Sequence, residues 1–319
     1  MRIVNNRFIA IILLVSLILT SGCSNTALLE ETSEALTSDA TVITTAETLV
    51  ETTEETEVPF KQKEITIDYY KIPDIYNSYL TEDEVALYNQ FVTNWLNYEP
   101  VLEFDDANQM GNVWGMIKEC FFLAYGDFNE EIGGFIVYGN CLMFNYKSQS
   151  KAEHERIIQE FEDRALSFYE GIDKSEEGLE LARHIYINYN STLDYNYDLY
   201  ESGDYTFLNS SGYTALMEGS GVCSSFAKAY SFLLRQAGIE AFDTSCVDHE
   251  WTILKMDDKY YFADPTWDYY KYPEDYSYFL FGLDRREADG YYEEDMILCC
   301  NGDFLMKDYL TVEREDYYN

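Results

Sequence analysis

Hydrophobic residues recur every three or four positions along several stretches of the chain, the spacing that places them on one face of an α-helix. Residues 81–98 show this spacing and open with a Thr-Glu-Asp-Glu sequence typical of a helix cap. Residues 151–169 show it again, as do the residues after Ser175, whose side chain is expected to cap the third helix. Residues 135–146 follow paired glycines and are typical of a strand. The pattern therefore predicts a mostly helical N-terminal region over residues 65–150.

The C-terminal half combines one helical pattern with two strand patterns. Apolar residues at intervals of three and four follow Cys223, and Gly238 suits the end of such a helix, so Cys223 falls in the first turn. Residues 250–256 and 259–264 are typical of strands, and the two aspartates that join them suit a tight turn. We therefore predict an α+β fold over residues 151–319, with a helix packed on an antiparallel sheet and a C-terminal extension.

The turn between these two strands determines which residues lie opposite one another. If Asp257 and Asp258 form a two-residue loop, Trp251 lies opposite Asp264. His249 is two places along from Trp251 and lies on the same face as Asp264, because side chains alternate along a strand. Diagonal neighbours of this kind are about 7–8 Å apart at Cα, within reach of a hydrogen bond between an imidazole and a carboxylate. The register thus predicts that His249 and Asp264 meet.

The first residues of the chain carry an export pattern. Two arginines precede an uncharged, mostly aliphatic run over residues 8–19, which suits the apolar part of a signal peptide. Ser21-Gly22-Cys23 follows and resembles the lipobox of bacterial lipoproteins, in which the Cys is acylated. We predict a signal peptide over residues 1–22, lipid attachment at Cys23, and a position on the outer face of the bacterial cytoplasmic membrane. An ordinary signal peptide or an uncleaved anchor is the alternative.

Composition adds a tether and narrows the range of partners. Residues 23–64 are rich in Thr, Ser and acidic side chains without a sustained hydrophobic period, so we predict a disordered tether. The whole chain has a formal net charge of −38 at pH 7, which repels nucleic acid and makes it an improbable partner. Its hydrophobic fraction of 47% is that of a folded protein.

Cys223 is the strongest candidate nucleophile. In the first turn of a helix, the unpaired backbone N–H groups and the helix dipole favour the thiolate over the thiol. The alternative is a buried structural Cys, which most free Cys are. Of the three histidines, His154 is expected to be solvated and His184 to be a core or surface residue, which leaves His249 as the candidate base. The sequence has neither Cys-x-x-Cys nor His-Glu-x-x-His, so we expect no metal and no cofactor.

Several motifs together resemble the transglutaminase-like superfamily. They are Gly221-Val222-Cys223, Gly238-Ile239, His249-Glu250-Trp251 and Asp264-Pro265-Thr266-Trp267-Asp268. The resemblance extends over roughly residues 180–270. It implies a papain-like core in which Cys223 is the nucleophile, His249 the general base and acid, and Asp264 the group that orients His249. Acidic Glu250 beside His249 departs from the pattern and is expected to raise the pKa of His249 if the two side chains approach.

The function expected from these observations is cysteine-dependent acyl transfer at amide bonds of peptides or protein side chains, through a thioester. Resolution by water would make the chain a protease or amidase, and resolution by an amine would make it a transglutaminase. The expected partners are a peptide or protein substrate at the cell surface and the membrane that holds the lipid anchor. The alternative is a non-catalytic, surface-tethered binding module that keeps the fold.

Overall fold

The computed structural model describes residues 59–105, 109–129, 134–299 and 304–318, which belong to one compact unit. The predicted signal peptide, Cys23 and residues 24–58 of the predicted tether lie outside the described residues. The predicted division near residue 150 stays a prediction. No helix in the described ranges combines the length and apolar character needed to cross a membrane.

The N-terminal region contains helices and a small sheet. Helix α1 (Glu82–Leu96) begins as predicted, because the Thr81 side chain accepts a hydrogen bond from the Glu84 N–H while the Glu84 carboxylate accepts one from the Thr81 N–H. The sheet has the order β1-β3-β2 and is antiparallel. The predicted strand at residues 135–146 is in fact its hairpin. The other elements here are η1 (Asp74–Ser78), β1 (Val101–Glu103), α2 (Gln109–Cys120), η2 (Phe122–Asp127), β2 (Phe135–Tyr138) and β3 (Cys141–Phe144).

The segment that follows is helical and leads to the candidate nucleophile. Helix α3 (Lys151–Ser167) forms as predicted, whereas α4 (Gly178–Asn190) has Glu177 at its cap position and not Ser175. The Ser175 hydroxyl donates to the Asp173 carboxylate instead, which corrects the capping prediction. The remaining elements are β4 (Asp194–Tyr195), α5 (Tyr197–Ser202), α6 (Gly212–Glu218) and β5 (Ser220–Gly221), of which β4 and β5 pair in parallel.

His154 corrects another expectation. It was expected to be solvated, but its side chain is fully buried and its Nδ1 lies 2.6 Å from Asp127 Oδ2. The rings of Trp95, Tyr98 and Tyr146 surround it. The charged residues around it in the sequence occupy the outer face of α3, so the helical position of His154 directs it into the core.

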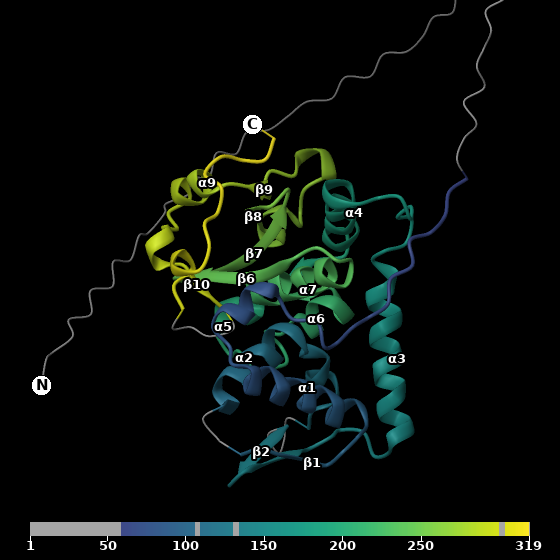
Figure 1. The fold of residues 1–319 in the computed structure, drawn as a ribbon. Helices are drawn as coiled ribbons and strands as arrows, with labels where there is room; N and C mark the ends of the chain where they lie inside the picture. Colours follow the sequence, from purple (N-terminus) through teal and green to yellow (C-terminus); the bar gives the residue numbers. More distant parts are fainter. Residues whose placement is uncertain (1–58, 106–108, 130–133, 300–303, 319) are drawn as a thin grey trace, which may run out of the picture. The chain divides into compact units, whose positions relative to one another are not determined.

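The main sheet is antiparallel with the order β10-β6-β7-β8-β9, and α7 (Cys223–Gln236) lies along β6 and β7 (Figure 1). This is the predicted helix on an antiparallel sheet. Its strands are β6 (Ala241–Cys246), β7 (His249–Met256), β8 (Lys259–Ala263), β9 (Phe279–Phe281) and β10 (Ile297–Leu298). Met256 pairs with Lys259, and Asp257 and Asp258 both have positive φ, so the predicted two-residue turn and register are confirmed.

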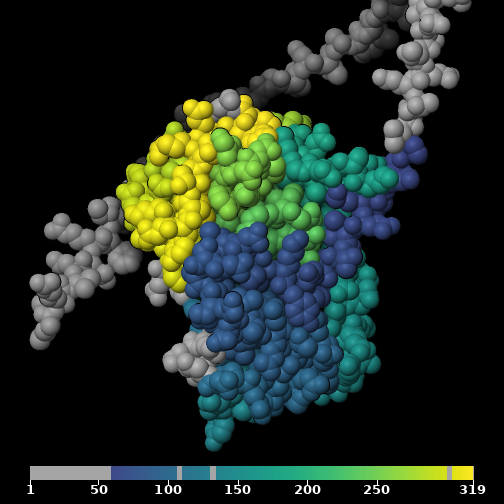
Figure 2. All heavy atoms as spheres, in the orientation of Figure 1, coloured from purple at the N-terminus to yellow at the C-terminus, as the bar shows by residue number. Residues whose placement is uncertain are grey.

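The C-terminal residues, yellow in Figure 2, lie beside both the green residues and the blue N-terminal residues. The Tyr79 ring, for example, lies 4.5 Å from the Phe304 ring. The elements of this part are α8 (Pro265–Asp268), η4 (Pro273–Asp275), α9 (Leu283–Ala288), η5 (Glu293–Asp295) and η6 (Met306–Asp308). Of these elements, α9 comes close to Asp264, because Arg286 Nη2 lies 2.8 Å from the Asp264 carboxylate.

Candidate active site

The residues directly before Cys223, at the N-terminus of α7, are tightly packed. A side chain at Gly221 would place its Cβ 2.5 Å from the Cβ of Ser225, so only glycine fits there. The Ser225 hydroxyl in turn accepts a hydrogen bond from the Val222 N–H. Cys223 is the first residue of α7 and its side chain is half-buried. Its own N–H has no acceptor within the helix, as is general for this position.

His249 and Asp264 meet as the register predicted. His249 Nε2 lies 2.7 Å from Asp264 Oδ2, and Asp264 is fully buried. The other carboxylate oxygen accepts a hydrogen bond from the Thr266 N–H and so caps α8. The Trp267 ring stacks on the imidazole, with centroids 5.5 Å apart. Since Nε2 is bonded to Asp264, Nδ1 is the ring nitrogen left for Cys223.

The charges of this site are tightly coupled. Burial lowers the pKa of His249, but the charge and hydrogen bond of Asp264, followed by those of Cys223, outweigh burial and raise the pKa to about 9. Burial raises the pKa of Asp264, but His249 and then Arg286 outweigh it and bring that pKa to about 2. An imidazolium beside a carboxylate is therefore the state at neutral pH.

Arg286, on α9, is a site residue that sequence reasoning missed. It is fully buried, and its Nη2 lies 2.8 Å from Asp264 Oδ2, the same oxygen that binds His249. In the sequence it is one half of an Arg285-Arg286 pair, which is typical of a solvated helix surface. No local signal distinguishes it, because its partner is far away along the chain.

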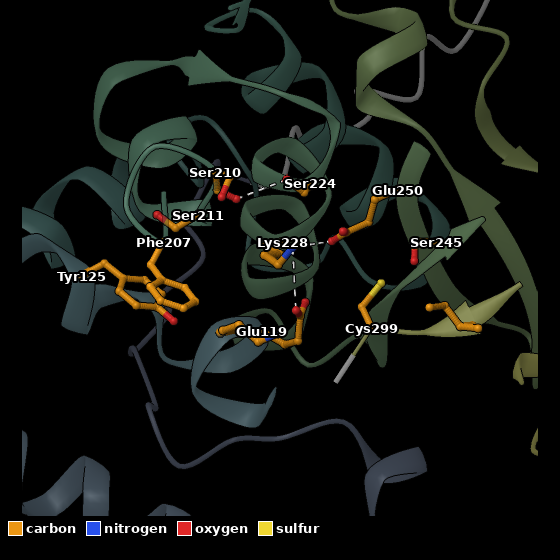
Figure 3. A pocket seen from close by; sticks show the side chains of 12 residues that line it. Glu119, Tyr125, Phe207, Ser210, Ser211, Ser224, Lys228, Ser245, Glu250 and Cys299 are labelled. Carbon is orange, nitrogen blue, oxygen red and sulfur yellow. Dashed lines mark hydrogen bonds and ion pairs between the residues drawn. The ribbon is translucent and has the colours of Figure 1, made fainter. Parts of the chain in front are cut away.

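Glu250 does not act on His249 as expected. Neighbouring residues on β7 point to opposite faces, and Glu250 points toward α7, where its carboxylate lies 2.5 Å from the Lys228 Nζ. Figure 3 shows Lys228 between Glu250 and Glu119, whose carboxylate is 3.7 Å away. Glu250 therefore belongs to a separate buried charge cluster.

That cluster contains the residues closest to a metal-binding arrangement. Carboxylate oxygens of Glu119, Asp243 and Glu250 all lie within 4.8 Å of one another. In the described part of the chain, these three residues are the group of His, Cys, Asp or Glu side chains whose spacing could hold a metal ion. Burial, followed by the charges of Glu119 and Glu250, raises the pKa of Asp243 well above its usual value. Lys228 already supplies a cation to the carboxylates of Glu119 and Glu250.

Two cavities contain residues of the site or their neighbours in the sequence. One, of about 400 Å³, is lined by His249 and a set of aromatic and polar residues: Tyr195, Tyr197, Tyr200, Asp248, Thr266, Trp267, Tyr269, Tyr270 and Tyr291. The other, of about 330 Å³, includes Ser224, the residue after Cys223, together with Lys228 and Glu250 (Figure 3). The Ser224 hydroxyl donates to the Ser210 carbonyl.

The other residues considered from the sequence lie elsewhere. The Nδ1 atom of His184 lies 3.0 Å from the Glu176 carboxylate. Asp268, the last residue of the Asp264–Asp268 motif, is fully buried and accepts hydrogen bonds from the Tyr186 hydroxyl and the Tyr278 N–H, so it fixes the following loop. Cys23, the predicted lipidation site, lies outside the described residues.

Comparison with known proteins identifies the segment that holds these residues. A family model described as the transglutaminase-like superfamily matches residues 167–274, which include Cys223, His249 and Asp264. Residues 167–274 are thus similar to the transglutaminase-like superfamily, as the motifs predicted, and they fold into a mixture of helices and antiparallel strands.

The chain is also similar to solved structures. One is the crystal structure of a TGase, at 14% identity and a TM-score of 0.31, covering 43% of this chain and 46% of that one. Another, proposed to be a cysteine protease from Cytophaga hutchinsonii, is 19% identical at a TM-score of 0.27, covering 33% of this chain and 37% of that one. The chain thus spans less than half of the length of either. No curated protein matches.

Proposed function

We propose that this protein is a cysteine-dependent acyl-transfer enzyme that acts on amide bonds of peptides or protein side chains. The family assignment supports a cysteine-dependent enzyme. The observation that carries the finer proposal is the hydrogen bond between His249 and Asp264, beside a Cys223 at the start of a helix. These three side chains come from α7, β7 and the start of α8, and both Asp264 and Cys223 raise the pKa of His249, which a purely structural Cys would not require.

In the proposed first step, the Cys223 thiolate attacks the carbonyl carbon of the amide. The imidazolium of His249 stabilises this thiolate, because Asp264 keeps His249 protonated. Negative charge moves to the carbonyl oxygen, where the free N–H of Cys223 can donate a hydrogen bond. The C–N bond then breaks, the leaving amine takes the proton from His249 Nδ1, and a thioester remains on Cys223.

In the second step, water or an amine attacks the thioester. Neutral His249 accepts the proton of the attacking group, and the Cys223 sulfur leaves as a thiolate when the thioester breaks, which restores the thiolate and imidazolium of the first step. Water gives hydrolysis, and an amine gives cross-linking. The cavity beside His249 is lined largely by tyrosines, so it offers flat faces and hydroxyls for the part of the substrate next to the reacting amide.

The proposal includes export and a lipid anchor at Cys23, supported by the apolar run and the Ser-Gly-Cys sequence. The substrate would then be a peptide or protein at the outer cell surface. The strongly acidic composition favours substrates that are neutral or cationic and disfavours nucleic acid.

Thiol reactivity in the full chain tests the proposal against a non-catalytic binding module. Iodoacetamide at pH 7 should label Cys223 far faster than Cys141, another partly exposed cysteine, and His249→Asn should remove most of that advantage. Equal labelling of the two cysteines would favour the binding module. Incorporation of a fluorescent primary amine into casein, compared with release of peptides, would then separate cross-linking from hydrolysis.

A further inference from the structure

Arg286 occupies an unusual place for a cation. It lies on α9, beyond residues 167–274 that match the transglutaminase-like superfamily, and it has no solvent exposure. Its guanidinium carbon is 4.2 Å from the Trp251 ring centroid, 4.7 Å from that of Phe281 and 4.8 Å from that of Trp267. A buried charge is costly unless a partner of opposite charge compensates it, so its pairing needs explanation.

The compensation comes from Asp264. Arg286 Nη2 and His249 Nε2 approach the same carboxylate oxygen, Asp264 Oδ2, at 2.8 and 2.7 Å. Within the described ranges, the Nε and Nη1 atoms of Arg286 have no hydrogen-bond acceptor, and aromatic ring faces surround the group instead. The charge of Arg286 also opposes the burial that raises the pKa of Asp289 and of Cys246, but Asp264 is its ion-pair partner.

Another buried arginine shows what a structural role looks like in this fold. Arg235 on α7 is also buried, and it donates to two backbone carbonyls, those of Ala241 and Glu119, which ties neighbouring segments together. Arg286 makes no such backbone bond in the described structure and directs its one ion pair at the carboxylate that orients His249. The contrast favours a role in the site over a role in holding the fold.

We propose that Arg286 is a positioning residue of the active site, which holds Asp264 in place and shares its negative charge with His249. This inference rests on the proposed function and extends it: the C-terminal region supplies a fourth member to the Cys223–His249–Asp264 arrangement. By sharing the charge, Arg286 keeps His249 from binding its proton too tightly, and His249 must release that proton in each cycle.

The charge-sharing role predicts the sign of a measurable change. Replacing Arg286 with Met removes a cation from the oxygen that His249 also binds, so the NMR titration midpoint of the His249 imidazole should rise by roughly one pH unit or more. Arg286→Lys keeps a cation and should stay near the unmodified protein. The matched control is Arg285→Met, because Arg285 is adjacent on α9 but pairs with Asp316. A midpoint that falls or does not move in Arg286→Met overturns the proposal.

Turnover of p-nitrophenyl acetate by the full chain supplies the second readout. If Arg286 acts through Asp264, Arg286→Met should lower the rate roughly tenfold or more, as for other groups that orient a reacting residue through a hydrogen bond. In an Asp264→Asn background the same change should have almost no further effect. If the two substitutions lower the rate by factors that multiply, the proposal is overturned. If Arg286→Met alone does not fold, the double variant, which lacks both buried charges, can still be compared with Asp264→Asn. Unchanged turnover in Cys223→Ala would instead refute the proposed function.

Discussion

Asp264→Asn is the change that tests the electrostatics of the site most sharply. Asparagine has nearly the same size as aspartate but no charge, so packing around residue 264 is kept while the charge between His249 and Arg286 disappears. The Asp264 carboxylate lies within 2.7 Å of His249 Nε2 and 2.8 Å of Arg286 Nη2, so both cations lose their partner at once.

The magnitudes follow from burial and from the pKa of His249. The rise from 6.5 to about 9 corresponds to about 3 kcal/mol that favours the imidazolium, at about 1.4 kcal/mol for each pH unit. Without the carboxylate, the two largest contributions that raise the pKa of His249 disappear and burial opposes the remaining contribution of Cys223, so this pKa should fall well below 9. Arg286 would remain buried without a counter-charge, and breaking such a pair typically costs about 3–5 kcal/mol of folding stability. The free energy of unfolding should therefore fall. If Asp264 only oriented His249 and did not also pair with the buried Arg286, the same change would leave folding intact.

Two measurements test this prediction. Urea unfolding at pH 7 should show the loss of stability, and NMR titration should show the His249 midpoint moving down from about 9. Asp248→Asn is the matched control, since Asp248 is next to His249 but bonds to the Tyr291 hydroxyl. If Asp264→Asn leaves the midpoint of His249 where it was, the coupling described for this site is wrong.

Further predictions concern other parts of the chain. Because folding raises the pKa of His249 to about 9, its contribution to stability is complete below about pH 6.5 and is lost as the pH rises through 9; urea unfolding should show up to about 3 kcal/mol of this loss, and less in His249→Asn. Lys228→Met leaves Glu250, whose side chain is 14% exposed, without its cation and should cost about 3 kcal/mol by the same assay, whereas Lys255→Met, at an exposed ion pair, should cost less than about 1 kcal/mol. Cys23→Ala should move the full chain, expressed in a bacterium, from the membrane to the soluble fraction, and equal partitioning would contradict the lipid anchor.

The features that could be predicted from the sequence are those that local rules determine. The two-aspartate turn requires positive φ at both residues, and once it forms, the alternation of side chains brings His249 to Asp264. In the same way, helical spacing after Cys223 determines where α7 begins. These inferences needed no knowledge of distant contacts.

The features that were missed depend on contacts between distant segments. Arg286 reaches Asp264 from a helix twenty-two positions later, and Lys228 bonds to Glu119 on α2, more than a hundred positions earlier. His154 was expected at the surface because its neighbours in the sequence are charged, but its buried partner Asp127 comes from another segment. Periodicity indicates which face of a helix is buried, but it does not indicate which charged residue of another segment that face contacts.

The measurement that tests the central claim most directly is the mass of the enzyme during turnover of an activated ester. We predict that the full chain mixed with p-nitrophenyl acetate near pH 7 releases a burst of p-nitrophenol and carries one acetyl group, located on Cys223 by peptide mapping and removed by hydroxylamine. Cys223→Ala should show neither burst nor acetylation, and His249→Asn should acetylate far more slowly. Acetylation at the same rate on several cysteines, or a burst that survives Cys223→Ala, would contradict the claim that Cys223 is the nucleophile.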